Sequence, residues 1–138
     1  MVELKRINDK VSVAGQILPA DIEVIRSAGF VTIINNRPDM EAPGQPSSSE
    51  IRAAAEVAGI AFYDIPMGRE GVSQDMIYRT RSALEGSEGP VLCFCRTGTR
   101  STTLWALSQA GHMDAADIIS AAANAGYDIS HLMGHLNN

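Results

Sequence analysis

Cys95 and the residues that follow it have the clearest chemical potential in this sequence. Residues 91–101 read Val-Leu-Cys-Phe-Cys-Arg-Thr-Gly-Thr-Arg-Ser, so an apolar stretch leads into a cysteine followed by a glycine and two arginines. The thiolate is the nucleophilic form of cysteine, and an unperturbed thiol is only about 3% ionised at pH 7. Because positive charge favours the thiolate, Arg96 and Arg100 mark Cys95 as a candidate nucleophile. We expect its sulfur to be ionised and open to solvent.

The same loop has the parts of an anion-binding site. A helix that starts just after the loop would turn unpaired backbone amides and partial positive charge toward Cys95. Gly98 lets the backbone approach an anion or turn with a positive φ, and the guanidinium of Arg100 matches two oxygens of a phosphate or sulfonate. Ser101 is expected to cap the helix, to donate to the thiolate, or to do both. We therefore predict an oxyanion site that consists, beside Arg100, of Arg96, Thr97, Gly98, Thr99 and Ser101.

Cys93 has a different predicted role, because it lies inside the apolar stretch. A free cysteine is among the residue types most often buried, so we expect Cys93 in the core. A disulfide between Cys93 and Cys95 is disfavoured, since one intervening residue gives a strained ring with poor disulfide geometry. Two cysteines cannot form a disulfide framework, which favours a reducing, cytoplasmic compartment.

Predicted strands and helices alternate along most of the chain. Apolar and β-branched runs indicate the strands, and capping or turn residues bound the helices. Such alternation forms βαβ units, so we expect an α/β fold with a mostly parallel central sheet and helices on both faces. The predicted strands are a hairpin of residues 3–7 and 11–15, then 30–35, 60–65 and 91–95; the predicted helices are 19–28, 51–58, 74–84, 101–110 and 114–125, with a short helical tail.

Three loops follow the carboxyl ends of predicted parallel strands, which is where ligands bind in such sheets. They are residues 36–46, 66–72 and 96–100. Within the first loop, Arg37 and Asp39 are candidates to pair with each other or to contact substrate. We favour an ordinary structural turn there, since asparagine, proline and aspartate are common turn residues.

The size and charge of the chain limit its number of domains and the kinds of partner it can bind. Its 138 residues fit one domain, residues 1–138, which needs no metal or disulfide to hold a core. The 11 basic and 16 acidic residues give a formal charge of −5, which argues against nucleic acid or an anionic membrane as a partner. No apolar run approaches the length of a membrane span. The oligomeric state stays open at this point.

The motif Cys95-x-x-Gly98-x-Arg100-Ser101 resembles the active-site loop of rhodanese sulfurtransferases, with its four residues between cysteine and arginine. Cysteine-dependent tyrosine and dual-specificity phosphatases use five, usually after a histidine where this chain has Phe94. The N-terminal half is nevertheless similar to those phosphatases. From about Gly15 to Tyr127 the chain resembles the bacterial phosphatase-like domain, DUF442, that also occurs fused to metallo-β-lactamase-type hydrolases. The segments that carry this resemblance are Gly15-Gln16, Asn35-Asn36-Arg37-Pro38-Asp39, the loop Glu41–Pro46 and the stretch Phe62–Pro66.

The resemblance implies a cysteine-phosphatase-like fold and leaves three functions to compare. As a phosphatase, Cys95 would attack a phosphomonoester and form a cysteinyl-phosphate, with Arg100 and the loop amides binding the phosphate. As a sulfurtransferase, the same thiolate would take sulfane sulfur from thiosulfate or a persulfide and pass it to a thiol. A domain that binds anions without turnover is the third. We favour the phosphatase.

A phosphatase also needs an acid that protonates the leaving group. Related phosphatases have an aspartate for this role in the loop after the Ile-Pro strand, whereas residues 66–72 of this chain contain none. Glu70 is therefore the predicted acid, with Asp75 and Asp64 as alternatives. A persulfide cycle needs no strong acid, so the missing aspartate keeps sulfur transfer open.

We expect no metal and no other cofactor. His131 and His135 are four residues apart and would share a helix face, but no third ligand is near in sequence and Gly134 weakens the helix. They are interpreted as surface histidines. Leu104 and Trp105, one turn into the helix after Cys95, are expected to pack in the core.

Overall fold

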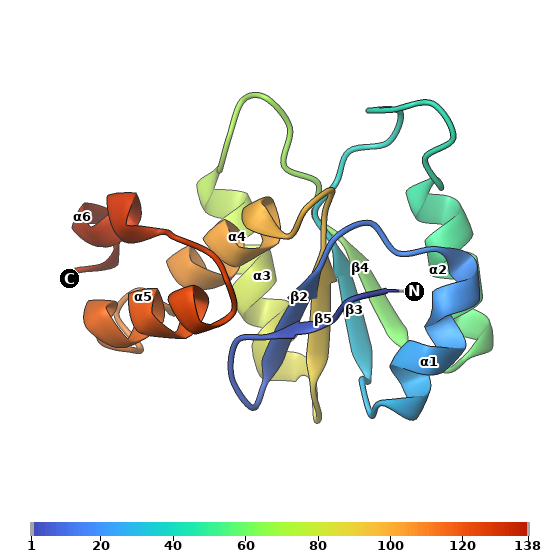
Figure 1. Ribbon diagram of the computed structural model, residues 1–138, viewed down its shortest axis with the longest axis horizontal. Helices are drawn as coiled ribbons and strands as arrows, with labels where there is room; N and C mark the ends of the chain where they lie inside the picture. The colour runs from blue at the N-terminus through green and yellow to red at the C-terminus, as the bar shows by residue number, and fades with distance from the viewer. Residues whose placement is uncertain (1, 138) are drawn as a thin grey trace.

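The computed structural model describes residues 2–137 and contains one five-stranded sheet (Figure 1). Its strands are β1 (Lys5–Arg6), β2 (Val11–Ala14), β3 (Thr32–Asn35), β4 (Ala61–Asp64) and β5 (Val91–Phe94). They lie side by side in the order β1-β2-β5-β3-β4. Only β1 and β2 pair in antiparallel fashion, and the other neighbours are parallel. The expected mostly parallel sheet is confirmed.

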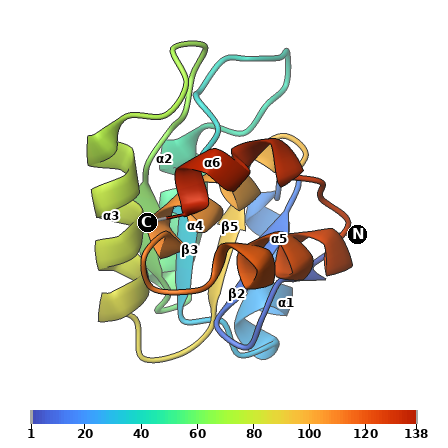
Figure 2. The same ribbon diagram turned by 90° about the vertical axis from the view of Figure 1, so that its left-hand side faces the viewer.

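Helices cover both faces of this sheet, as predicted (Figure 1). They are α1 (Ile22–Ser27), α2 (Ser48–Val57), α3 (Gln74–Gly86), α4 (Thr99–Gln109), α5 (Ala115–Asn124) and α6 (Met133–Leu136), with short 3₁₀ turns before α1 and α6. Helices α1 and α2 lie on one face and α3 and α4 on the other, while α5 and α6 pack on α4 (Figures 1 and 2). Within residues 2–137, none of the helices has the length and apolar composition that a membrane crossing requires.

The core forms two apolar clusters, one on each face of the sheet. Successive strand residues point to opposite faces, so Ile33 belongs to the cluster under α1 and α2 and Ile34 to the one under α4. Both are fully buried, as are the side chains predicted for the core, Cys93, Leu104 and Trp105. Burial raises the pKa of the Cys93 thiol to about 12, with a smaller contribution from the charge of Cys95, so this thiol stays protonated.

The register of the parallel strands places the ends of three of them side by side. Phe94, the last residue of β5, aligns with Ala14 at the end of β2 and with Asn35 at the end of β3. The backbone ladder extends one step further, because the Cys95 amide donates to Ala14 and the Asn36 amide to Phe94. Cys95 therefore emerges at the centre of the edge where the predicted loops begin.

Helix α4 begins at Thr99, two residues before the predicted start. Its N-cap is Gly98, which has a φ of 93° in the left-handed region. Ser101 consequently lies inside the first turn, and the prediction that it caps the helix is wrong. The physical reason is that Gly98 turns the chain immediately, a conformation that residues with a side chain rarely adopt. Arg100 thereby also belongs to the first turn of the helix.

Candidate active site

Cys95 lies in the tight loop between β5 and α4. The backbone N–H of Gly98 donates to the Cys95 sulfur at 3.1 Å, because the left-handed turn at Gly98 directs that amide back into the loop. The sulfur thus sits at the N-terminus of the 11-residue helix α4. Unpaired amides and the helix dipole place partial positive charge there, which favours a thiolate and a bound anion.

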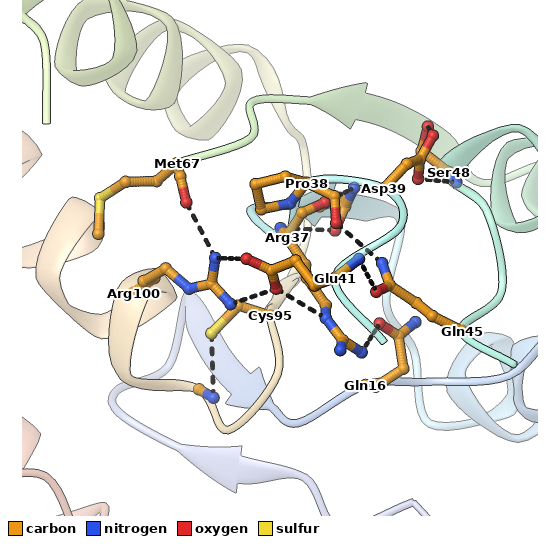
Figure 3. A network of polar contacts seen from close by, with 12 residues as sticks. Gln16, Arg37, Pro38, Asp39, Glu41, Gln45, Ser48, Met67, Cys95 and Arg100 are labelled. Atoms are coloured by element: carbon orange, nitrogen blue, oxygen red, sulfur yellow. Dashed lines mark hydrogen bonds and ion pairs between the residues drawn. The ribbon is translucent and has the colours of Figure 1, made fainter. Parts of the chain in front are cut away.

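The sulfur is covered, with Cys95 only 1% exposed. The expectation that it is open to solvent is therefore wrong for this conformation. The guanidinium of Arg100 lies beside the sulfur (Figure 3). Hydrogen bonds to Glu41 raise the pKa of Arg100 most strongly, and Cys95 acts in the same direction through its charge and a hydrogen bond.

Two glycines let neighbouring segments hold the loop closely. A Cβ on Gly98 would lie 2.1 Å from the Tyr127 hydroxyl, and that hydroxyl donates to the carbonyl of Thr97 at 2.9 Å. On the other side, a Cβ on Gly15 would lie 2.9 Å from the carbonyl oxygen of Arg96. The loop is therefore fixed between the end of β2 and the C-terminal segment, and its amides are preorganised.

Arg100 connects the three loops that were predicted to converge. Its Nη1 donates to Glu41 Oε2 at 2.9 Å and to the Met67 carbonyl at 2.9 Å, and its Nη2 donates to Glu41 Oε1 at 2.8 Å (Figure 3). Glu41 comes from the loop after β3 and Met67 from the loop after β4. The convergence of these loops at the carboxyl ends of the strands is confirmed.

Glu41 is a site residue that the sequence reasoning missed. Its Oε1 also accepts from Nε of Arg37 at 3.0 Å, so one carboxylate serves two guanidinium groups. The hydrogen bonds from Arg100 and then Arg37 lower the pKa of Glu41 to about 2, although burial opposes them. The only signal in the sequence was a glutamate four residues after an arginine in a loop, and such spacing predicts a contact only on a helix.

The suggested pairing of Arg37 with Asp39 is wrong. Asp39 instead accepts from the backbone N–H of Ser48 at 2.8 Å and from its hydroxyl at 3.3 Å, at the start of α2. The Arg37 side chain is 6% exposed and donates to Glu41 and to the side-chain oxygen of Gln16. A buried cation requires such partners, and a carboxylate is the strongest available.

The other predicted oxyanion-binding residues differ in exposure. Arg96, Thr97 and Thr99 are exposed, and the hydroxyls of the two threonines lie 3.2 Å apart. The Ser101 hydroxyl is buried, and it is the only buried side-chain polar atom within residues 2–137 that has no hydrogen-bond partner. It therefore has a donor to offer at the start of α4.

The three acid candidates are spread over the region after β4. Asp64 accepts from Asn35 at 2.8 Å, Asp75 is exposed beside Arg79, and Glu70 is exposed in the turn that follows Met67. None of the hydrogen bonds or ion pairs of these carboxylates in the described part of the chain involves Cys95 or Arg100. Residues 2–137 also contain no group of three potential metal ligands, and this includes His131 and His135.

Gly98→Ala is expected to destabilise the protein more than a matched glycine substitution. Gly59 also has a positive φ, of 76°, but open space around its Cα, so Gly59→Ala loses only the roughly 1–2 kcal/mol that the left-handed conformation costs a side chain. Gly98→Ala adds the collision with Tyr127. Urea unfolding of both variants measures the difference. Equal losses would show that Tyr127 does not constrain the loop.

Acid should weaken the contribution of Glu41 to stability. Its pKa falls from 4.5 to about 2 on folding, so the unfolded chain takes up the proton first. The stabilisation is therefore fully present above pH 4.5 and is lost as the pH falls toward 2. Unfolding free energies of the wild type and Glu41→Gln should converge over this range. A difference that stays constant with pH would contradict the assignment.

A family model described as the beta-lactamase hydrolase-like protein, phosphatase-like domain, matches residues 3–112. A beta-lactamase hydrolase-like protein of Agrobacterium fabrum is 36% identical over 126 residues, which cover 90% of this chain and 29% of that protein. The chain thus spans less than a third of the length of this relative. The residues that the family model matches contain all three loops around Cys95.

Two solved structures have the same architecture. A candidate phosphatase (NMA1982) from Neisseria meningitidis is 32% identical with a TM-score of 0.82, and the match covers 96% of this chain and 95% of that one. The core catalytic domain of the PP-IP phosphatase SIW14 from S. cerevisiae has a TM-score of 0.67 at 13% identity, covering 94% and 80%. At that identity the likeness shows the fold alone. The chain has a cysteine-phosphatase fold and belongs to the phosphatase-like domain family of the beta-lactamase hydrolase-like proteins.

Proposed function

We propose that this chain is a cysteine-dependent phosphatase that hydrolyses phosphomonoesters, with Cys95 as the nucleophile. The observation that carries the proposal is the position of the Cys95 sulfur, which accepts the Gly98 N–H at 3.1 Å at the N-terminus of α4 and lies beside Arg100. A helix terminus, loop amides and a guanidinium together suit a thiolate and a tetrahedral oxyanion. The family and fold support phosphate ester chemistry.

In the first step the Cys95 sulfur attacks phosphorus in line with the ester oxygen. A sulfur–phosphorus bond forms as the phosphorus–oxygen bond breaks, and the bonding electrons leave with the alkoxide or phenoxide. In the second step water attacks the cysteinyl-phosphate and releases orthophosphate and the thiolate. Arg100 and the amides of residues 96–99 stabilise the equatorial oxygens, where charge develops.

The closed conformation requires a small movement before the first step. Because Cys95 is 1% exposed, side chains around its sulfur must shift as substrate enters. The Ser101 hydroxyl has no hydrogen-bond partner among the described residues and so does not donate to the Cys95 sulfur in this structure, and its proposed second role is to donate to the thiolate during turnover. A thiolate nucleophile also fits the proposed cytoplasmic, reducing compartment.

Glu70 is the proposed general acid. It follows Met67 in the same loop, and the Met67 carbonyl already accepts from Arg100 at 2.9 Å, so this loop reaches the site. Asp64 is engaged by Asn35, and Asp75 lies beside the cation of Arg79. These partners of Asp64 and Asp75 are why Glu70 stays the proposed acid.

Sulfur transfer is the second candidate function. The four-residue spacing from Cys95 to Arg100 favours it, and so does the absence of contact between Cys95 and any of the three acid candidates in the described residues. The sulfur of Cys95 would attack sulfane sulfur, release sulfite from thiosulfate, and pass the sulfur to an acceptor thiol. A domain that binds anions without turnover is the third.

Replacing Cys95 and measuring both phosphate release and sulfur transfer distinguishes these functions. Cys95→Ser should abolish phosphate release from p-nitrophenyl phosphate, since a serine hydroxyl is not ionised at neutral pH. The matched control Cys93→Ala should lose some stability but keep activity, because Cys93 is buried in the core. Transfer of sulfur from thiosulfate to cyanide by the wild type should stay at background. Thiosulfate turnover without phosphate release would replace the proposal with sulfur transfer.

Glu70→Gln tests the acid. If Glu70 protonates the leaving group, kcat should fall by about 10²–10⁴-fold for a poor leaving group such as phenol, and less for p-nitrophenol, which needs little protonation. The fall of activity at high pH should flatten in the variant. Asp75→Asn is the matched control and should behave as the wild type. An unchanged pH–rate profile in Glu70→Gln would remove Glu70 from this role.

A further inference from the structure

The oxygen acceptors around Arg100 occupy one edge of its guanidinium and leave another edge free of oxygen acceptors. An arginine has five N–H donors in a fixed plane. Both hydrogens of Nη1 are used, on Glu41 and on the Met67 carbonyl, and one hydrogen of Nη2 is used on Glu41. The Nε hydrogen and the second Nη2 hydrogen have no oxygen acceptor among the described residues, and the Cys95 sulfur, which also hydrogen-bonds to Arg100, lies beside the guanidinium. These two hydrogens point in parallel from the same edge, which is the arrangement that binds two oxygens of one phosphate.

Glu41 therefore does not occupy the edge that a substrate phosphate needs. Its two oxygens take the outer end of the guanidinium, at 2.9 Å and 2.8 Å, and hold that end in place. In the described residues, the neutral carbonyl of Met67 is the only other oxygen that accepts a hydrogen bond from the Arg100 guanidinium. With Glu41 in place, the outer end of the guanidinium is fixed.

Glu41 is itself fixed by a buried residue. Arg37 has a side chain 6% exposed, donates to Glu41 Oε1 at 3.0 Å, and is also held by Gln16. The backbone of Arg37 is tied on both sides to the side chain of Asn35, the last residue of β3. A continuous series of hydrogen bonds thus connects the end of β3 to Arg100 through Arg37 and Glu41.

The two arginines and Glu41 together carry one net positive charge, which offsets the charge of a thiolate at Cys95. Two guanidinium groups share one carboxylate, and the low pKa of Glu41, about 2, keeps that carboxylate ionised near neutral pH. One positive charge remains beside Cys95. If Glu41 instead blocked the anion site, its carboxylate would lie on the edge that is free of oxygen acceptors.

We infer that Glu41, anchored by the buried Arg37, is a positioning residue that holds Arg100 with the edge that is free of oxygen acceptors directed at the substrate oxyanion. This inference rests on the proposed function, because the oxyanion is that of the phosphomonoester. It assigns a role in the site to the loop after β3, which the chemistry of Cys95 alone does not require.

Glu41→Gln tests the inference, because the amide keeps the shape but replaces one acceptor by a donor that faces an arginine. We expect the inhibition constant for orthovanadate, an analogue of the pentacoordinate transition state, to rise by about 10- to 100-fold, because misplacing a catalytic group by an ångström has a cost of that order. kcat/KM for p-nitrophenyl phosphate should fall in parallel. Glu41→Asp keeps the charge and should recover part of both losses.

Asp39→Asn is the matched control in the same loop. Asp39 binds Ser48 and not Arg100, so this variant loosens the loop without removing the carboxylate on Arg100. Its inhibition by orthovanadate should equal that of the wild type. Thermal unfolding of each variant shows that it is folded, and Glu41→Asp provides a second route if Glu41→Gln is not.

The direction of the change decides the outcome. Tighter orthovanadate binding by Glu41→Gln would show that Glu41 obstructs the site, and unchanged binding would show that it does not position Arg100; either result overturns the inference while leaving the phosphatase proposal intact. If Asp39→Asn and Glu41→Gln lost affinity for orthovanadate equally, the loss would be a general effect of loosening the loop after β3, and the inference would also be overturned. A wild type that neither hydrolyses p-nitrophenyl phosphate nor binds orthovanadate would remove the proposed function, and the inference with it.

Discussion

The left-handed turn at Gly98 is the constraint on which the site depends. It ends the path of β5, starts α4 at the next residue, and aims its own amide at the Cys95 sulfur at 3.1 Å. The turn also puts Arg100 in the first helical turn, from which its side chain reaches two other loops. A residue with a Cβ would meet both the strain of a positive φ and the ring of Tyr127. The same local turn therefore positions the Cys95 sulfur, the loop amides and the Arg100 guanidinium.

Electrostatics then connects this loop to the rest of the molecule. The site concentrates positive charge in a chain whose formal charge is −5, and a single carboxylate, Glu41, is shared by Arg37 and Arg100. Burying Arg37 without that carboxylate would leave a cation out of water with only an amide as partner, which is costly. The ion pair between Glu41 and Arg100 joins the loop after β3 to the start of α4. The same contacts thus stabilise the loop after β3 and hold the site together.

Much of the architecture followed from local patterns. Alternating strands and helices predicted a mostly parallel sheet, and the rule that ligands bind at the carboxyl ends of its strands selected the three loops that meet at Arg100. Cys93 was separated from Cys95 by its place inside the strand. The expectation that the Cys95 sulfur is open to solvent was wrong, because the sulfur is covered. Two alternatives are also excluded: Ser101 does not cap α4, and Arg37 pairs with Glu41 and not with Asp39. The first depends on the backbone conformation of Gly98 and the second on the path of the loop after β3.

The sequence by itself determined the chemical repertoire of the site, because Cys95, Gly98 and Arg100 are close enough along the chain for their spacing to constrain their geometry. The tertiary structure alone decided which carboxylate Arg100 would bind. Glu41 lies 59 residues away and in a loop, where no periodicity relates side chains to a common face. Its contact exists because β3 and β5 are neighbours in register, so that the loops after them leave the sheet together. Strand order is a property of the whole packed sheet, and no segment read alone contains it.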